Sequence, residues 1–276
     1  MDLISVNQVK CTKCGICIEV CPTRIMSMDE KGPILETPDL CIACGHCVAA
    51  CPNEAIDNSK NPLSKQIELK ETPVINADVA EQFLRSRRSI RCFKNKNVPL
   101  NQLLKLLDIA RFAPTASNSQ GLSFIIVNDR AVLEKATEIT VQWMEGQLEN
   151  PLHKSFPLHV RAVREKGINT ILRDAPHLIL ATAPIDFKNG RENTIFSFAY
   201  LELFANILGL GSCWAGLLEM CAFSNHKPLI ELFNIPDGKV LTGAVMVGFP
   251  KYNFKRLVER NSLEVLWLDC DEMENK

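Results

Sequence analysis

Eight of the twelve cysteines lie within the first 51 residues of the chain, where they form a repeated pattern. The run C-x2-C-x2-C-x3-C-P occurs twice, and the second copy follows the first by 30 positions. Three cysteines at three-residue spacing on a tight loop can hold three corners of an iron–sulfur cube, and this run is typical of 4Fe–4S ligation. The cysteines are Cys11, Cys14, Cys17 and Cys21 in the first run and Cys41, Cys44, Cys47 and Cys51 in the second.

The fourth cysteine of each run is predicted to bind the cluster of the other run. Cys21 and Cys51 follow a helical turn and precede a proline, so neither easily reaches the cube held by its own three cysteines. The pattern therefore predicts two 4Fe–4S clusters with crossed ligands. One cluster is assigned to Cys11, Cys14, Cys17 and Cys51, and the other to Cys41, Cys44, Cys47 and Cys21.

Zinc and disulfides are the alternative uses of these cysteines. Structural zinc sites usually combine paired C-x2-C arms, and disulfide frameworks are typical of short secreted chains. Met1–Lys10 contains no apolar run of signal length, so we expect a cytoplasmic protein with reduced thiols. Residues 3–57 resemble bacterial-type two-cluster ferredoxins over their whole length, which implies one-electron transfer at low potential. His46 is expected to be a bystander, because the cysteines fill every ligand position.

A basic segment follows the cysteine-rich region. Six basic residues and no acidic one lie between Arg85 and Lys96. Guanidinium forks and the Ser89 hydroxyl suit the oxygens of a phosphate. A solvated basic face or a nucleic-acid patch is the alternative, but the net charge is −1 and the chain has no recognised nucleic-acid motif. The segment therefore favours one bound phosphate, and no nucleic-acid partner is expected.

Four motifs between residues 80 and 268 resemble, in order, those of the FMN-dependent nitroreductase family. The family often has Pro-Trp where this chain has Gly121-Leu122, and its last motif commonly has a proline that is absent here. The motifs are Arg87-Arg88-Ser89-Ile90-Arg91 with Phe93, the run from Ala113 to Gln120, the run from Leu208 to Gly216, and Gly248-Phe249-Pro250-Lys251 with Arg256 and Arg260.

The resemblance implies an FMN site at the interface of a homodimer. Positive charge at Arg91, near the pyrimidine end of the flavin, would favour the anionic reduced form. A glycine beside the ring would allow close approach of the backbone. The implied residues are Arg87, Arg88 and Ser89 at the phosphate and ribityl chain, with Arg256 and Arg260 completing the phosphate clamp; Pro114, Thr115, Ala116, Asn118 and Gln120 in a loop from the partner subunit; and Ala215 and Gly216 beside the ring.

No side chain is predicted to act as a catalytic acid or base, because solvent can protonate the product. His153 and His159 lie in the polar stretch 145–166, which is expected to form a lid over the flavin. Either histidine is a candidate proton donor, although surface histidines are more common than catalytic ones. For Cys92 and Cys213, a redox contact and a small apolar packing role both stay open.

The elements that must position these motifs divide the chain into two domains. Residues 1–57 are expected to form a ferredoxin-like domain, 58–78 a polar linker, and 79–276 an FMN-binding domain. The expected fold class is α+β, with the two-cluster ferredoxin domain preceding a nitroreductase-like α+β domain. Helices are predicted over 79–87, 100–112, 131–148 and 194–208, and strands over 123–128, 177–183 and 240–247.

Composition and hydropathy are those of a soluble globular protein. No segment reaches the roughly 20 apolar residues needed to span a bilayer, so no membrane partner is expected. The predicted function is an oxidoreductase in which two clusters relay electrons to FMN and on to a small electron-poor acceptor, such as a nitroaromatic or a quinone. The donor is expected to be an external ferredoxin, flavodoxin or NAD(P)H. The alternatives are an NAD(P)H-dependent FMN reductase that passes electrons outward through the clusters, and a non-catalytic electron carrier or redox sensor.

Overall fold

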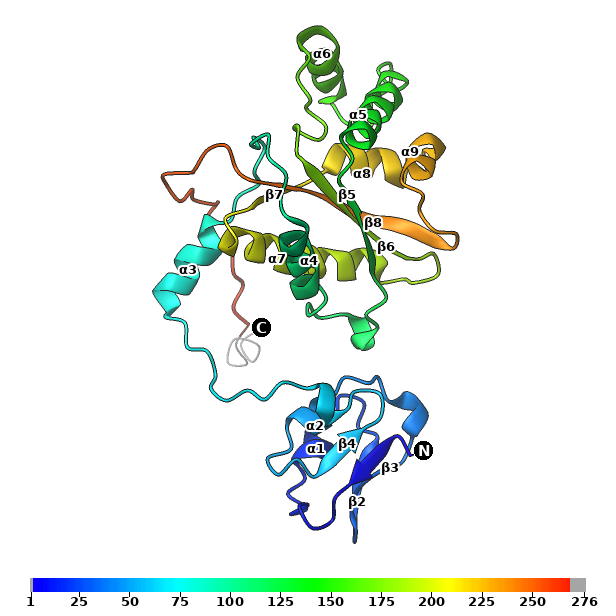
Figure 1. Ribbon diagram of the computed structural model, residues 1–276, viewed down its shortest axis with the longest axis vertical. Helices are drawn as coiled ribbons and strands as arrows, with labels where there is room; N and C mark the ends of the chain where they lie inside the picture. Colours follow the sequence, from blue (N-terminus) through cyan, green and yellow to red (C-terminus); the bar gives the residue numbers. More distant parts are fainter. Residues whose placement is uncertain (1, 269–276) are drawn as a thin grey trace, which may run out of the picture.

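The computed structural model describes residues 2–268, and its N-terminal part is a small unit built around the cysteine runs (Figure 1). Two antiparallel strand pairs and three short helices make up this unit, and the third cysteine of each run lies in one of the one-turn α-helices. The pairs are β1 (Ile4–Val6) with β4 (Ile56–Asn58) and β2 (Met26–Asp29) with β3 (Gly32–Leu35); the helices are α1 (Ile16–Glu19), η1 (Pro38–Leu40) and α2 (His46–Ala49).

The backbone of this unit repeats with the same 30-residue period as the sequence. The glycine before each one-turn helix has a left-handed conformation, with φ +80° at Gly15 and +74° at Gly45. Glycine adopts this conformation without a Cβ clash, so the chain turns sharply between the second and third cysteines of each run. Positive φ recurs at the equivalent pairs Lys13 and Ala43, and Arg24 and Glu54.

The connection to the larger domain contains one short helical turn, η2 (Leu63–Lys65), before α3 (Ala77–Ser86). The Asn76 side chain caps α3 by accepting hydrogen bonds from the backbone N–H groups of Asp78 and Val79 at 2.8 and 3.4 Å. Asparagine is a favoured N-cap because its oxygen satisfies N–H groups that have no partner within the helix. The cap explains why the helix begins two residues before its predicted start.

A four-stranded antiparallel sheet forms the centre of the larger domain, in the order β5-β6-β8-β7. β5 (Ser123–Val127) pairs with β6 (His177–Pro184), and β8 (Lys239–Gly248) pairs with both β6 and β7 (Gly211–Trp214). The central strands β6 and β8 are almost fully buried, as their continuous apolar sequences require.

Helices cover both faces of this sheet, which gives three layers (Figure 1). Side chains alternate between the faces of a strand, so Ile179 and Ala181 of β6 pack on one side and Leu178 and Leu180 on the other. On the first side lie α4 (Leu100–Ala110) and α7 (Gly190–Ile207); on the second lie α5 (Arg130–Glu145), α6 (Phe156–Lys166), α8 (Gly216–Phe223) and α9 (Lys227–Leu232).

The observed architecture confirms the α+β fold class, and every predicted helix and strand is present within a few residues of its expected ends. Two predictions differ. The stretch expected as a lid contains the regular helix α6, anchored by buried Phe156 and Val160. The run from Leu208 to Gly216, for which no strand is predicted, contains the edge strand β7 (Gly211–Trp214). Within residues 2–268, no helix is long and apolar enough to cross a membrane.

Candidate cofactor sites

Two hollows in the N-terminal unit each gather one of the predicted crossed sets of cysteines. The crossing follows from the pairing of β1 with β4. Because β1 precedes Cys11 and β4 follows Cys51, their pairing brings Cys51 close to the first cysteine run. Cys11, Cys14, Cys17 and Cys51 line the first hollow, and Cys21, Cys41, Cys44 and Cys47 line the second.

The surroundings of the sulfurs suit thiolate ligands. Both hollows have mainly apolar walls, to which Ile56 and Met26 contribute. The Ala55 N–H donates to Cys51 Sγ at 3.2 Å, and the Asn58 amide donates to Cys41 Sγ at 3.8 Å. Hydrogen bonds to sulfur and exclusion of solvent both tune iron–sulfur centres. The residues therefore fit the cofactor that the motif predicts.

Neighbouring thiols confirm that these sulfurs lie close to one another. Burial raises the pKa of Cys17, and the thiols of Cys51 and Cys14 raise it further. Burial also raises the pKa of Cys47 to about 11, with smaller contributions from the other three cysteines of its hollow. Within residues 2–268, no three His, Cys, Asp or Glu side chains converge tightly enough to hold a single metal ion.

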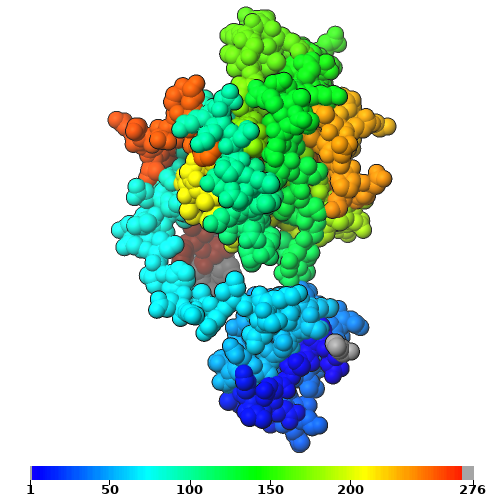
Figure 2. Space-filling view, viewed as in Figure 1, coloured from blue at the N-terminus to red at the C-terminus, as the bar shows by residue number. Residues whose placement is uncertain are grey.

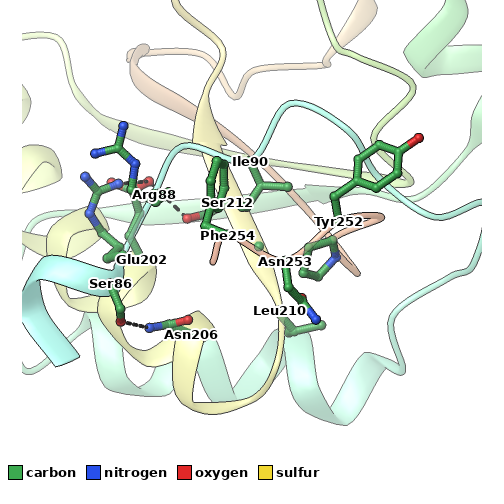
Figure 3. Close-up of a pocket in the computed structure, with 13 residues that line it drawn as sticks. Ser86, Arg88, Ile90, Glu202, Asn206, Leu210, Ser212, Tyr252, Asn253 and Phe254 are labelled. Carbon is green, nitrogen blue, oxygen red and sulfur yellow. Dashed lines mark hydrogen bonds and ion pairs between the residues drawn. The ribbon is translucent and has the colours of Figure 1, made fainter. Parts of the chain in front are cut away.

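The second and third arginines of the basic segment both line a polar cavity of about 200 Å³, which Figure 3 shows in close-up. Arg87 and Arg88 line it with Ser212 and with the segment from Pro250 to Phe254. The Arg88 guanidinium lies 6.0 Å from the centre of the Phe254 ring. Two guanidinium groups are donors that suit the oxygens of a phosphate.

Close packing against β7 positions this segment. The Ile90 N–H donates to the Ser212 carbonyl at 2.8 Å, and Ser89 bridges Ser212 as a short parallel pair. Gly211 is required here, because a Cβ at this position would lie 2.5 Å from Ile90 Cγ1. The third and first motifs therefore hold each other in place.

A buried carboxylate, Glu202 of α7, lies at the base of the same cavity. It accepts hydrogen bonds from Ser212 Oγ at 3.0 Å and from Trp214 Nε1 at 3.1 Å, and its oxygen lies 3.7 Å from Arg87. The three contacts orient the Arg87 side chain and fix β7. Because Glu202 balances only one of the two arginines, the cavity keeps a net positive charge that suits a phosphate.

Arg91 lies apart from Arg87 and Arg88, in a second cavity of about 330 Å³. Cys213 and Gly216 of the third motif line this cavity as well. A Cβ built on Gly216 would meet no atom within 4 Å, so the glycine leaves open space where a flat ring is expected to lie. Burial raises the pKa of the Cys213 thiol, the opposite of what a reactive thiolate needs.

The run from Ala113 to Gln120 lies in neither of these cavities. It contains the short turn η3 (Ala116–Asn118) and borders a third cavity, of about 1000 Å³, which reaches Cys44 of the second cysteine run. The Asn118 amide donates to the carbonyls of Ile42 and Ala43 at 3.0 and 3.2 Å. Figure 2 shows the N-terminal domain against this part of the larger domain.

One chain therefore does not unite all the predicted flavin contacts. Pro114, Thr115, Asn118 and Gln120 line the cavity toward the cysteines, while Ala116 is fixed by a hydrogen bond to Asn193 at 3.2 Å. A site shared between two subunits would need this separation. Arg256 and Arg260 line none of the three cavities; both are exposed, and Arg260 makes only a backbone contact with its neighbour Glu259. Their role stays a prediction.

Comparison with known proteins supports the arrangement of motifs. The model of the nitroreductase family matches residues 84–249, and that of the 4Fe–4S dicluster domain matches residues 10–56. The chain belongs to the nitroreductase family. It is an oxidoreductase of this family that carries a 4Fe–4S dicluster domain in its N-terminal part.

Named relatives match the nitroreductase domain. A "Putative NADH dehydrogenase/NAD(P)H nitroreductase" of Archaeoglobus fulgidus is 29% identical over 170 residues, which cover 62% of this chain and 84% of the relative. An iodotyrosine deiodinase of Thermotoga neapolitana is 28% identical over 173 residues, covering 60% and 86%. An FMN-bound nitroreductase structure from Bacteroides fragilis shares the fold, with a TM-score of 0.53 at 19% identity over 70% of this chain and all of that one.

Sequence reasoning missed three features of these sites. Glu202 lies in a helix that reads as apolar core, so no local pattern indicates its contact with Arg87. The hydrogen bonds of Asn118 to the cysteine-run loop join segments 75 and 76 residues apart. Thr170 and Arg173 of the second cavity carry no motif, although His159, which lines the same cavity, is among the predicted candidates.

Proposed function

We propose that the protein relays electrons from two 4Fe–4S clusters to FMN and on to an electron-poor aromatic acceptor or quinone. The proposed cluster ligands are the crossed cysteine sets that line the two hollows. The domain division at 1–57, 58–78 and 79–276 is part of the proposal. Because such clusters need reduced thiols, the proposal also places the protein in the cytoplasm.

FMN, when bound, accepts electrons singly or in pairs, so it suits a site between one-electron clusters and a two-electron acceptor. The residues proposed to hold it are Arg87, Arg88 and Ser89 at the phosphate, Arg91 at the pyrimidine end, and Ala215 and Gly216 beside the ring. The proposal keeps solvent as the proton source, with His153 and His159, which line the second cavity, as the alternative proton donors.

The hydrogen bonds from Asn118 to the Ile42 and Ala43 carbonyls are the observation that carries the relay. They join the loop that holds the second cluster's cysteines to the loop proposed to contact flavin. The second cluster, with Cys21 as its fourth ligand, is therefore the proposed exit point. The side-chain oxygen of Asn118, Oδ1, accepts a hydrogen bond from Gln120 Nε2 at 3.1 Å. This contact orients the Asn118 side-chain NH₂ group toward the cysteine loop.

The flavin site is proposed to be completed by a second copy of the chain. Ile195, Phe196 and Tyr200 are large apolar or aromatic side chains on the exposed face of α7, and a dimer interface would cover them. The exposed apolar run from Leu263 to Leu268 offers a further contact. In such a dimer the Asn118 loop reaches the partner's flavin, so each chain's clusters serve the flavin of the other.

A second candidate uses NAD(P)H as the direct donor to FMN, with the clusters carrying electrons outward. The names of the Archaeoglobus fulgidus and Methanothermobacter thermautotrophicus relatives favour it. The cavity beside Gly216 favours an enzyme over a pure carrier, because a carrier needs no room for a substrate.

Anaerobic donor and acceptor screening tests the proposal. Purified protein is mixed with reduced ferredoxin, NADH or NADPH, and flavin absorbance and the iron–sulfur EPR signal are followed together. The acceptors are a nitroaromatic, a quinone and, because deiodinases are among the relatives, an iodotyrosine. The proposal expects the EPR signal to appear before the flavin is reduced. Flavin reduction by NAD(P)H before any cluster signal would favour the second candidate instead.

A further inference from the structure

The chain leaves the central sheet at Ala215, which lies between the end of β7 and the start of α8. The Ala215 N–H still donates to the Ala244 carbonyl of β8 at 2.9 Å, which continues the register of β7 with β8. In an antiparallel ladder the Ala215 carbonyl would in turn accept from the Ala244 N–H. It accepts instead from the backbone N–H of Glu219 at 2.9 Å, in the first turn of α8. The Ala244 N–H thereby loses its partner in the sheet.

The Glu219 side chain supplies the missing acceptor. Its Oε1 accepts from the Ala244 N–H at 2.7 Å, and the residue is only 5% exposed. A buried backbone N–H without a partner is strongly unfavourable, so the carboxylate stabilises the change from strand to helix at this point. Glu219 thus satisfies both ends of the broken rung, with its own N–H at the Ala215 carbonyl and its carboxylate at the Ala244 N–H.

Arg191 of α7 holds the Glu219 carboxylate in this position. The guanidinium donates to Oε1 and Oε2 of Glu219 at 3.2 and 3.1 Å, a two-point pairing that fixes the plane of the carboxylate. A third hydrogen bond runs from Arg191 to the Thr242 carbonyl at 2.8 Å. Thr242 lies at the shift in register between β6 and β8, where it has no partner residue on β6. The bulge therefore leaves a carbonyl available to the arginine.

The Arg191 guanidinium also lies over two aromatic rings. Its central carbon is 4.9 Å from the centre of the Trp214 ring and 5.1 Å from that of Phe223. Trp214 is the last residue of β7, and Phe223 is the last residue of α8. Stacking of a guanidinium on an aromatic face is attractive. Arg191 therefore ties together the end of β7, the end of α8 and the acid between them.

This network lies directly behind the second cavity. α8 begins at Gly216, which lines that cavity together with Leu217. Ala215 and Gly216 are the residues proposed to lie beside the flavin ring. Their position depends on where the chain leaves the sheet, because closing the rung at Ala215 would extend β7 and draw Gly216 toward the strand. The exit point therefore sets how closely this backbone approaches the ring.

We propose that Glu219 is a positioning residue for the flavin. Its carboxylate, held by Arg191, fixes the exit of the chain from the sheet and thereby the approach of Ala215 and Gly216 to the ring. Glu219 acts through the backbone, since it lines none of the three cavities described above. This assignment rests on the proposed function, because it places the flavin ring beside Gly216.

Two substitutions separate the acceptor from the charge. Glu219→Gln keeps an oxygen that accepts from the Ala244 N–H but loses the charged pairing with Arg191, whereas Glu219→Leu removes the acceptor at similar size. FMN is titrated into the flavin-depleted full-length protein with its clusters intact, and the quenching of flavin fluorescence gives each Kd. The visible circular dichroism of the bound flavin reports the surroundings of the ring, and hydrogen exchange of the peptide that contains Ala244 reports the rung without flavin.

Glu219→Leu should weaken FMN binding about tenfold, the scale of one lost hydrogen bond to a charged group, and change the dichroism of the bound flavin. Exchange at Ala244 should become faster. Glu219→Gln should bind FMN within about threefold of the wild type and keep its spectrum, because the lost ion pair contains an arginine whose side chain is 40% exposed. Arg191→Lys keeps the charge and loses the two-point pairing, so it should change the spectrum in the same direction by a smaller amount.

Leu218→Ala is the matched control, because Leu218 precedes Glu219 in α8, is fully buried and lines none of the three cavities. It should lower the stability of the domain through the cavity that it leaves, and keep the FMN affinity and the spectrum. An equal loss of FMN affinity in Leu218→Ala and Glu219→Leu would overturn the proposal, as would an unchanged spectrum in both Glu219→Leu and Arg191→Lys. The proposed function fails on a different observation, the absence of FMN binding by the wild-type protein.

Discussion

In the described part of the N-terminal domain, five buried residues form one small hydrophobic core, and two of them, Cys17 and Cys21, are proposed cluster ligands. In the nitroreductase domain, two separate hydrophobic cores of 24 and 12 buried residues lie on the two faces of the sheet. A domain of fewer than 60 residues rarely buries enough apolar surface to fold without metals or disulfides. We therefore expect the first domain to depend on its proposed clusters for its structure, and the second to need its proposed FMN only for chemistry.

Loss of one cluster ligand is the largest effect expected from this contrast. Cys21→Ser should remove the cluster assigned to Cys41, Cys44 and Cys47, lowering iron from about eight to about four atoms per chain. Because metal binding and folding are coupled, the N-terminal domain should lose protection from amide exchange, and the nitroreductase domain should keep its own. Iron analysis and hydrogen exchange measure both. Cys92→Ser is the control, since Cys92 is exposed and outside the two cysteine runs. Loss of the other cluster in Cys21→Ser would show that the ligands are not crossed.

Truncation of a core side chain in the nitroreductase domain should destabilise that domain and leave the N-terminal domain and its iron unchanged. Phe198 of α7 is fully buried and packs edge-on against Trp214 at 5.1 Å between ring centres. Phe198→Ala should destabilise the nitroreductase domain by about 3–5 kcal/mol, from lost burial and the cavity that remains. Denaturant unfolding followed by tryptophan fluorescence measures the change. Iron content should not change, and the half-exposed Phe223→Ala should cost much less.

Removal of a proposed phosphate ligand should affect binding more than folding. Arg87→Ala should weaken FMN binding about thirtyfold, equivalent to about 2 kcal/mol, because a charge-assisted hydrogen bond is lost. Flavin fluorescence during titration of the apoprotein gives the affinity. Arg85→Ala is the matched control, since Arg85 is exposed and already paired with Glu81 and Glu259. An unchanged FMN affinity in Arg87→Ala would remove Arg87 from the phosphate site.

The smallest loss of stability is expected when an ion pair on the outer surface of the nitroreductase domain is removed. Hydrogen bonds from Arg164 hold the pKa values of Glu138 and Glu145 below their usual range. This contribution is present above the unfolded-state pKa of the carboxyls and is lost as the pH falls through their lowered values. Arg164→Ala should cost less than about 1 kcal/mol at neutral pH, because the groups are partly exposed, and nothing in acid. A loss that does not depend on pH would contradict the ion-pair account.

The sequence predicts most of the fold because the decisive signals are local. The apolar runs of β6 and β8 and the helical spacing of α4 and α7 each lie within one short window. The edge strand β7 escapes prediction because Gly211 weakens its strand signal, and only the close approach of Ile90 explains the glycine. The start of α3 depends on the Asn76 cap, which shifts a boundary but not the element.

The candidate sites are predictable to the extent that their residues share a motif. The cysteine sets and the segment from Arg87 to Arg91 are recognisable because the spacing of their residues along the sequence matches the shape of the group that they are proposed to bind. Glu202, Thr170 and Arg173 are not, because they meet the motifs only through packing of distant elements. The contact between Asn118 and the Ile42 carbonyl joins the two domains, and no local pattern encodes it.

The order in which electrons reach the two domains tests the central claim most directly. One electron equivalent of reduced viologen is mixed rapidly with the anaerobic, FMN-loaded protein, and the iron–sulfur EPR signal and flavin absorbance are followed in time. The account predicts a cluster signal that decays as the flavin is reduced, with the second phase at least tenfold slower in Asn118→Leu when the rate is compared at equal iron and FMN occupancy of the two proteins. Flavin reduction with no preceding cluster signal, at the same rate in both proteins, would contradict it.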